Sequence, residues 1–197
     1  MILAIDTETN DGAKNWRAAE DDLAAEDDLL AWPRIVQLGM VLAEEDGTIV
    51  EQHCVLIKPD GWKIAAGAQR VHGISIDDCE SDGIPIQDAL VMLRQLASFQ
   101  TLIVAHNMAF DWPVVRCESI RSLIPLEGVM FKRRCTMQLG TDFCKIPGRH
   151  RGDYKWPKLA ELHQRLLGTG FEGAHNALDD AKACLRCYVE LRNRGFA

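Results

Sequence analysis

Long apolar runs are missing from this sequence of 197 residues. No stretch approaches the ~20 consecutive apolar residues that a membrane-spanning helix needs. The first apolar run has no basic region before it, and Asp6 and Glu8 interrupt it at once, which is not the pattern of a secretory signal peptide. We therefore expect a cytoplasmic protein without membrane segments.

A disulfide framework is missing too. The seven cysteines are scattered and odd in number, so we interpret them as reduced thiols of a cytosolic protein. Cys184 and Cys187 form a CxxC, but no second pair accompanies it and the segment has a helical pattern. We interpret this pair as part of a helix, in its core or on its surface, rather than as a metal or redox site.

An excess of positive charge is also absent. The formal net charge is −7, which argues against an extended basic surface for nucleic acid. Much of the negative charge lies in residues 11–32, which hold seven acids, two bases and the tandem repeat AAEDDL at 18–23 and 24–29. A period of six does not match a helical turn. We interpret 11–32 as a largely solvated insertion in a single domain that spans residues 1–197.

The apolar patterns predict an α/β domain with a mixed sheet. Residues 2–6 and two β-branched runs within 34–59 predict a three-stranded antiparallel meander. A short buried strand is expected at 101–107. Helices are expected at 86–99, 110–124, 157–168 and 177–194. In the second of these, Asp111 stands where a cap would and Pro113 suits the first turn.

Four acids lie at the ends of predicted elements. Asp6 and Glu8 end the first strand, and they project to the same side because side chains alternate with period two. Asp111 begins the helix after the buried strand, and Asp180 lies near the start of the last helix. If His175 lies in the loop before that helix, His175 and Asp180 can reach one point. Carboxylates that lie so close together repel one another, and a divalent cation is the usual partner that neutralises them.

This combination resembles the DnaQ-like family of 3′–5′ exonucleases, the DEDDh group, in its proofreading type. The three family motifs stand here as AIDTET (4–9), VAHNMAFD (104–111) and HNALDD (175–180). Three further segments look like family segments: RIVQLG (34–39), VHGIS (71–75) and WPKLAELH (156–163). The resemblance covers nearly the whole chain except 11–32. It implies a ribonuclease H-like fold, a mixed five-stranded sheet flanked by helices.

The resemblance also implies a reaction. Two divalent metal ions, Mg²⁺ or Mn²⁺, would be bound by Asp6, Glu8, Asp111 and Asp180, and oxygen donors of this kind suit hard cations. Asp6 would bridge both ions. His175 would be the general base, since an imidazole titrates near neutral pH. The expected activity is hydrolysis of phosphodiester bonds from the 3′ end, with release of nucleoside 5′-monophosphates.

Candidate substrate contacts come from two places. By resemblance, the backbone around Thr7 and Thr9 would lie beside the terminal nucleotide, and Asn107 of the second motif would either fix the local backbone or contact substrate. Segment 145–158 has five bases against one acid. Its interleaved aromatic residues suit stacking on single strands. Lys155 and Trp156 are therefore candidate contacts, with a solvated basic loop as the alternative.

Single-stranded DNA is the expected substrate, because the three further segments look most like those of proofreading-type members. An exoribonuclease that trims RNA 3′ ends is the first alternative, since the 2′-OH is sensed by local contacts and not by the metal site. A non-catalytic module that docks by its acidic insertion is the second, and the presence of all five site residues disfavours it. The resemblance also suggests a polymerase or replication partner, and no membrane partner is expected.

Overall fold

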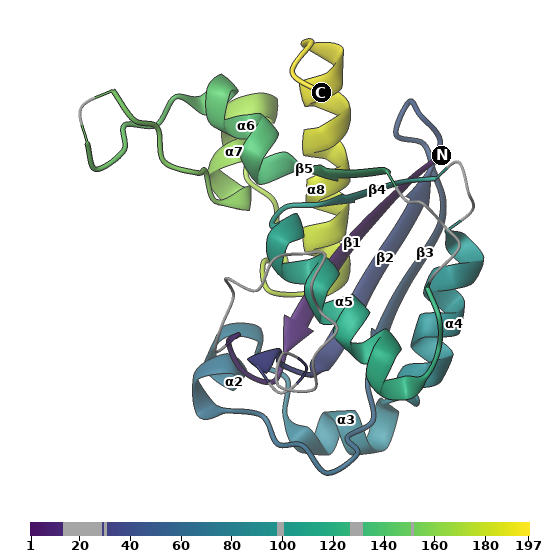
Figure 1. The fold of residues 1–197 in the computed structure, drawn as a ribbon. Coiled ribbons are helices and arrows are strands. Elements are labelled where there is room, and N and C mark those ends of the chain that lie inside the picture. The colour runs from purple at the N-terminus through teal and green to yellow at the C-terminus, as the bar shows by residue number, and fades with distance from the viewer. Residues whose placement is uncertain (14–28, 30, 98–100, 127–131, 151) are drawn as a thin grey trace.

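The computed structural model describes residues 1–13, 29, 31–97, 101–126, 132–150 and 152–197. Its elements are, in chain order (Figure 1), β1 (Ile2–Thr9), β2 (Ile35–Ala43), β3 (Ile49–Leu56), α2 (Ala66–His72), α3 (Ile76–Asp82), α4 (Ile86–Leu96), β4 (Leu102–Ala105), α5 (Met108–Ser122), β5 (Lys132–Cys135), α6 (Thr136–Cys144), α7 (Leu159–Leu167) and α8 (Ala177–Asn193). None of the helices described here has both the length and the apolar composition needed to span a bilayer.

The strands form one mixed sheet in the order β3-β2-β1-β4-β5. β1 pairs antiparallel with β2, and β2 antiparallel with β3, so the expected three-stranded meander is confirmed. β4 and β5 extend the sheet in parallel register beside β1. The expected five-stranded α/β fold is therefore confirmed, and β1 lies at the centre of the sheet.

Helices cover both faces of this sheet (Figure 1). On one face Leu3 and Ile5 pack with α4 and α5, and on the other Ile2 and Ala4 pack with α8. Side chains alternate between the two faces of the sheet along the whole of β1. Beyond the core, Asp6 and Glu8 continue the α8 side of β1, whereas Thr7 continues the α5 side.

The second expected helix begins earlier than the sequence suggested. Asn107 is its N-cap residue, Met108 its first residue, and Pro113 lies inside it. The expected capping role of Asp111 is wrong, because the chain turns into the helix directly after β4. Asp111 lies in the first turn, and its carboxylate accepts hydrogen bonds from Thr7 on β1 instead.

Of the other predicted helices, two are confirmed and one is shorter than predicted. The helices at 157–168 and 177–194 are confirmed as α7 and α8, and Cys184 and Cys187 are buried on α8. The helix expected at 86–99 ends at Leu96, and residues 98–100 lie outside the described chain. The elements α2, α3, β5 and α6 were not predicted from the sequence.

The acidic insertion lies almost wholly outside the described residues, including its tandem repeat except Leu29. Its two ends are joined. The Asn10 N–H donates to the Arg34 carbonyl oxygen at 3.0 Å, and the Arg34 N–H donates to Asn10 Oδ1 at 2.8 Å. These bonds tie the end of β1 to the start of β2 beside the point where the insertion leaves and returns, next to a shift of strand register between Glu8 and Thr9.

Candidate functional site

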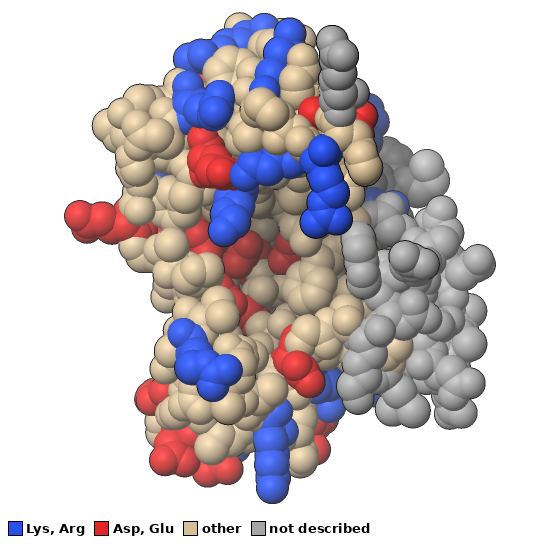
Figure 2. All heavy atoms as spheres, turned by 90° about the vertical axis from the view of Figure 1, so that its left-hand side faces the viewer, with Lys and Arg blue, Asp and Glu red and all other residues tan. Residues whose placement is uncertain are grey.

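Three chain segments meet at one edge of the sheet. Because β1 and β4 are parallel neighbours, the residues after β4 arrive beside the end of β1, and α5 brings Asp111 there. The loop before α8 and the first turn of that helix bring His175 and Asp180. Figure 2 shows a hollow on this side of the molecule, with acidic side chains at its bottom and Lys and Arg side chains bordering it from above.

Glu8, His175 and Asp180 form the tightest group. One potential ligand atom from each lies within 4.8 Å of the other two. The His175 N–H donates to Asp180 Oδ2 at 2.9 Å, and the His175 backbone has a φ of 70°. A non-glycine residue in this left-handed region is strained by roughly 1–2 kcal/mol. The strained backbone is held by the same carboxylate that shares the site with the imidazole.

Asp111 reaches the site from the opposite face of β1. Its Oδ1 accepts from the Thr7 N–H at 3.0 Å and from Thr7 Oγ1 at 2.8 Å. Both donors of Thr7 are thus used within the protein. Thr7 therefore positions Asp111. The Thr9 hydroxyl donates to the Asp11 carbonyl oxygen at 2.9 Å.

The four carboxylates oppose one another's ionisation. Burial raises the pKa of Asp6 well above its usual value, and the carboxylates of Asp111, Asp180 and Glu8 raise it further. Burial and the nearby Asp180 and Asp111 raise the pKa of Glu8 to about 7. Burial raises the pKa of Asp111 to about 7 despite its bonds from Thr7, and burial raises that of Asp180.

Such a set of groups fits a hard divalent cation. All four carboxylates offer oxygen, the described residues beside them include no thiolate ligand, and a bound cation would remove their mutual repulsion. The donor set that the sequence predicted for Mg²⁺ or Mn²⁺, namely Asp6, Glu8, Asp111 and Asp180, is thus brought together around the end of β1.

Two β2 residues to which the sequence reasoning gave no role hold the start of α8. Gln37 Oε1 accepts from the Ala177 N–H at 2.9 Å, and Gln37 is the sheet neighbour of Glu8. Gly39 is the sheet neighbour of Asp6, and a Cβ atom at Gly39 would lie 2.1 Å from the Ala177 carbonyl oxygen. The only signal in the sequence was that both residues lie in RIVQLG.

His106 fixes the basic loop to the site. Burial lowers its pKa to about 4, so the ring is neutral near pH 7. Nε2–H donates to the Pro157 carbonyl oxygen at 3.1 Å, and Nδ1 accepts from Thr136 Oγ1 at 3.0 Å. The end of segment 145–158 is therefore anchored to the residue that directly precedes Asn107.

Two of the candidate substrate contacts, Asn107 and Trp156, lie at one cavity beside the start of α5. Trp156 and Asn107 line a cavity of about 330 Å³ together with Ala13, Ala109, Phe110 and Met137. Trp156 is 52% exposed, which leaves its ring available for stacking. Lys155 Nζ pairs with Glu161 Oε1 at 2.8 Å. An exposed pair of this kind is weak, so Lys155 can exchange its partner for a phosphate.

Comparisons with known proteins bear on the family and the fold of the chain. A family model described as "Exonuclease" (RNase_T) matches residues 3–188. No curated protein matches the sequence significantly.

Several solved structures share the fold. Escherichia coli exonuclease I in complex with a dT13 oligonucleotide is 18% identical, with a TM-score of 0.75 over 98% of this chain and 41% of that one. The zinc-bound form of its single-stranded DNA complex is 19% identical, with a TM-score of 0.73 over 98% and 40%. The chain thus spans about two fifths of the length of these structures.

Metal-free protein should lose stability as the pH rises from about 4 to about 7. The folded state raises the pKa of Glu8 and of Asp111 to about 7, so in this window it binds more protons than the unfolded chain and deprotonation destabilises it. The Tm in EDTA should fall across this range, and saturating Mn²⁺ should reduce the fall. Glu8→Gln should flatten it, and Glu45→Gln, in the exposed β2–β3 turn, should not. Equal slopes in these two variants would contradict the argument.

Gly39→Ala should weaken divalent cation binding without unfolding the protein. The added Cβ would force the start of α8 away from β2 and move Asp180 relative to Glu8. We expect Mn²⁺ affinity, measured by calorimetry, to fall by about tenfold or more, in line with the precision that metal sites require. Gly67→Ala is the matched control, since only the end of a flexible arginine lies near that position. An unchanged Mn²⁺ affinity in Gly39→Ala would refute this role.

Proposed function

The chain belongs to the exonuclease family whose model matches residues 3–188, and from that membership we propose that it is a metal-dependent 3′–5′ exonuclease acting on single-stranded DNA. One observation carries the proposal. Asp6, Glu8, Asp111, Asp180 and His175 come from three distant segments, and the fold brings all five to one edge of the sheet. The products would be nucleoside 5′-monophosphates.

The carboxylates of Asp6, Glu8, Asp111 and Asp180 would hold two divalent ions, Mg²⁺ or Mn²⁺. Bound there, such ions would polarise the phosphodiester and neutralise charge that develops on its oxygens. The protein's own contribution is to hold the four ligands together. Thr7 fixes Asp111, and Gln37 and Gly39 fix the start of the helix that carries Asp180.

His175 would be the general base. Its imidazole is exposed to the site beside Glu8 and Asp180, where it can accept a proton from the attacking water. Proton transfer to a positioned side chain contributes ~10²- to 10⁴-fold to a rate. The hydrogen bond from the His175 backbone N–H to Asp180 Oδ2 supports this proposal, because it ties the backbone that carries the imidazole to this carboxylate.

Several observations favour an unpaired DNA end as substrate. The cavity beside Asn107 presents Trp156 and Phe110, and stacking of this kind needs bases that are not paired. Lys155 lies next to Trp156 and could follow the backbone phosphates. The E. coli exonuclease I structures that share the fold contain dT13 and other DNA oligonucleotides. A polymerase or replication protein as partner rests on the resemblance to proofreading-type members alone.

The activity is tested with matched single-stranded DNA and RNA oligomers labelled at the 5′ end, incubated with Mg²⁺ or Mn²⁺. We expect a ladder that shortens from the 3′ end, faster on DNA, and that is absent with EDTA and in Asp6→Ala. His175→Ala should lower kcat by ~10²-fold or more while it retains Mn²⁺ binding. A folded protein that binds Mn²⁺ but cleaves neither oligomer would overturn the proposal and favour a binding module.

Trp156→Ala should raise KM for single-stranded DNA with little change in kcat. Loss of one base-stacking contact costs about 1–3 kcal/mol, which predicts a rise in KM of roughly 5- to 150-fold. Trp156→Phe keeps an aromatic face and should recover most of the affinity. Steady-state kinetics with short oligomers measures both constants. A fall in kcat at constant KM would exclude a role in substrate stacking.

A further inference from the structure

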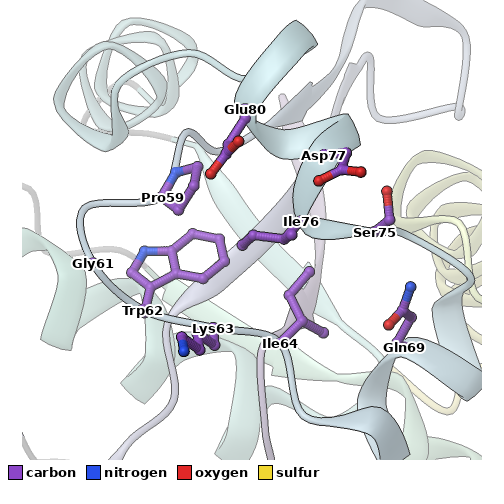
Figure 3. Close-up of a pocket in the computed structure, with 10 residues that line it drawn as sticks. All are labelled: Pro59, Gly61, Trp62, Lys63, Ile64, Gln69, Ser75, Ile76, Asp77 and Glu80. Atoms are coloured by element: carbon purple, nitrogen blue, oxygen red, sulfur yellow. The ribbon is translucent and has the colours of Figure 1, made fainter.

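A second cavity lies beside α2 and α3 and has no role in the proposed reaction. Its volume is about 630 Å³, and it is lined by residues of loop 59–64, α2 and the start of α3 (Figure 3). Its apolar part consists of Pro59, Trp62, Ile64 and Ile76. The core beneath it fixes these walls, since Trp62 packs against the main hydrophobic cluster.

The rim of this cavity is acidic on one side. Asp77 and Glu80 lie one turn apart on α3, and both side chains are exposed. In Figure 3 both carboxylates lie on the same side of the cavity, and that of Glu80 lies above the Trp62 ring system. Lys63, the basic residue of the lining, lies at the opposite end of the view. The cavity therefore combines an indole face with two neighbouring negative charges.

The capping arrangement of α3 leaves these two acids free. The Ser75 hydroxyl accepts from the Asp78 N–H, and Asp78 Oδ2 accepts from Ser75 in return. Asp78 is thereby used for the cap. Among the residues that the structure describes, the side chains of Asp77 and Glu80 form no hydrogen bond and no ion pair. Two exposed carboxylates without cationic partners repel any phosphate, so the cavity does not suit a nucleotide or the DNA backbone.

We propose that this cavity is a docking site for an arginine side chain of a basic polypeptide segment. The aliphatic part of arginine would lie on Ile76 and Ile64, and its guanidinium would stack on Trp62, where the negative face of the indole ring attracts a cation. Its five N–H donors can engage both carboxylates at once, which the single ammonium of lysine does less well. The partner is thus a protein with an exposed arginine in an extended segment.

The wall of this cavity is hydrogen-bonded to the residue that follows β1. The Asn10 Nδ2 donates to the Lys63 carbonyl oxygen at 2.9 Å, and the Ala65 N–H donates to the Asn10 carbonyl oxygen at 2.8 Å. Asn10 directly follows β1, which carries Asp6 and Glu8. The cavity lies at the end of the molecule that carries α2 and α3, whereas α6 and α7 lie at the other end (Figure 1).

The test is an NMR titration of ¹⁵N-labelled protein with a short glycine- and serine-rich peptide that contains one arginine. The matched probe replaces that arginine by citrulline, which keeps the shape and removes the charge. We expect the indole N–H signal of Trp62, assigned with Trp62→Phe, to shift in a saturable way. The citrulline peptide should bind with an affinity at least about tenfold lower.

Two double variants of equal charge locate the site. Asp77→Asn with Glu80→Gln should weaken the arginine peptide by about tenfold. Glu44→Gln with Asp88→Asn, away from the cavity, should leave the affinity within about twofold. Both pairs are exposed, and neither should change metal binding or nuclease activity, so a failure here is separable from a failure of the proposed reaction.

Three results would overturn the docking site. The first is equal binding of the arginine and citrulline peptides. The second is an equal affinity of the two double variants for the arginine peptide. The third is a saturable shift of the Trp62 signal with a nucleoside 5′-monophosphate but not with the arginine peptide, which would assign the cavity to a nucleotide.

Discussion

The mutual repulsion of four carboxylates at the end of β1 is the constraint on which this structure depends. Burial and neighbouring charge raise the pKa of Asp6, Glu8, Asp111 and Asp180 together. Such an arrangement costs stability in the metal-free protein. It persists only if surrounding residues hold the acids in place or a counter-charge relieves their repulsion. Neighbouring residues hold the four carboxylates in place, and the donor set suits the divalent cations that would relieve their repulsion.

Several of the residues that position the four acids are uncharged. Thr7 spends both of its donors on Asp111, Gln37 satisfies the first N–H of α8, and Gly39 lets that helix approach the sheet. Each of them is a sheet residue between or beside the acids, so one strand pair controls the positions of ligands that come from three parts of the chain. This placement on strands rather than loops gives the site its precision.

The sequence was informative where regular geometry links residues to one another. Period two in β1 predicted that Asp6 and Glu8 share a side, and the spacing from His175 to Asp180 predicted a loop followed by a helical turn. It was uninformative where the outcome depends on contacts between distant segments. The cap of α5 was misassigned because Asp111 bonds to Thr7, 104 residues away. Likewise, nothing local distinguishes Gly39 or His106 from ordinary core residues.

Charge distribution explains how an acidic chain can belong to a nuclease family. The net charge of −7 suggests repulsion of DNA, but a field acts locally, over a Debye length of about 8 Å at physiological salt. Lys and Arg side chains border the hollow on one side, and acidic side chains lie at its bottom, where cations would cancel their charge (Figure 2). The acids Asp77 and Glu80 line a separate cavity. The same negative charge that would repel a phosphate there would favour a cationic partner, so two separate hollows of the described chain would suit ligands of opposite charge.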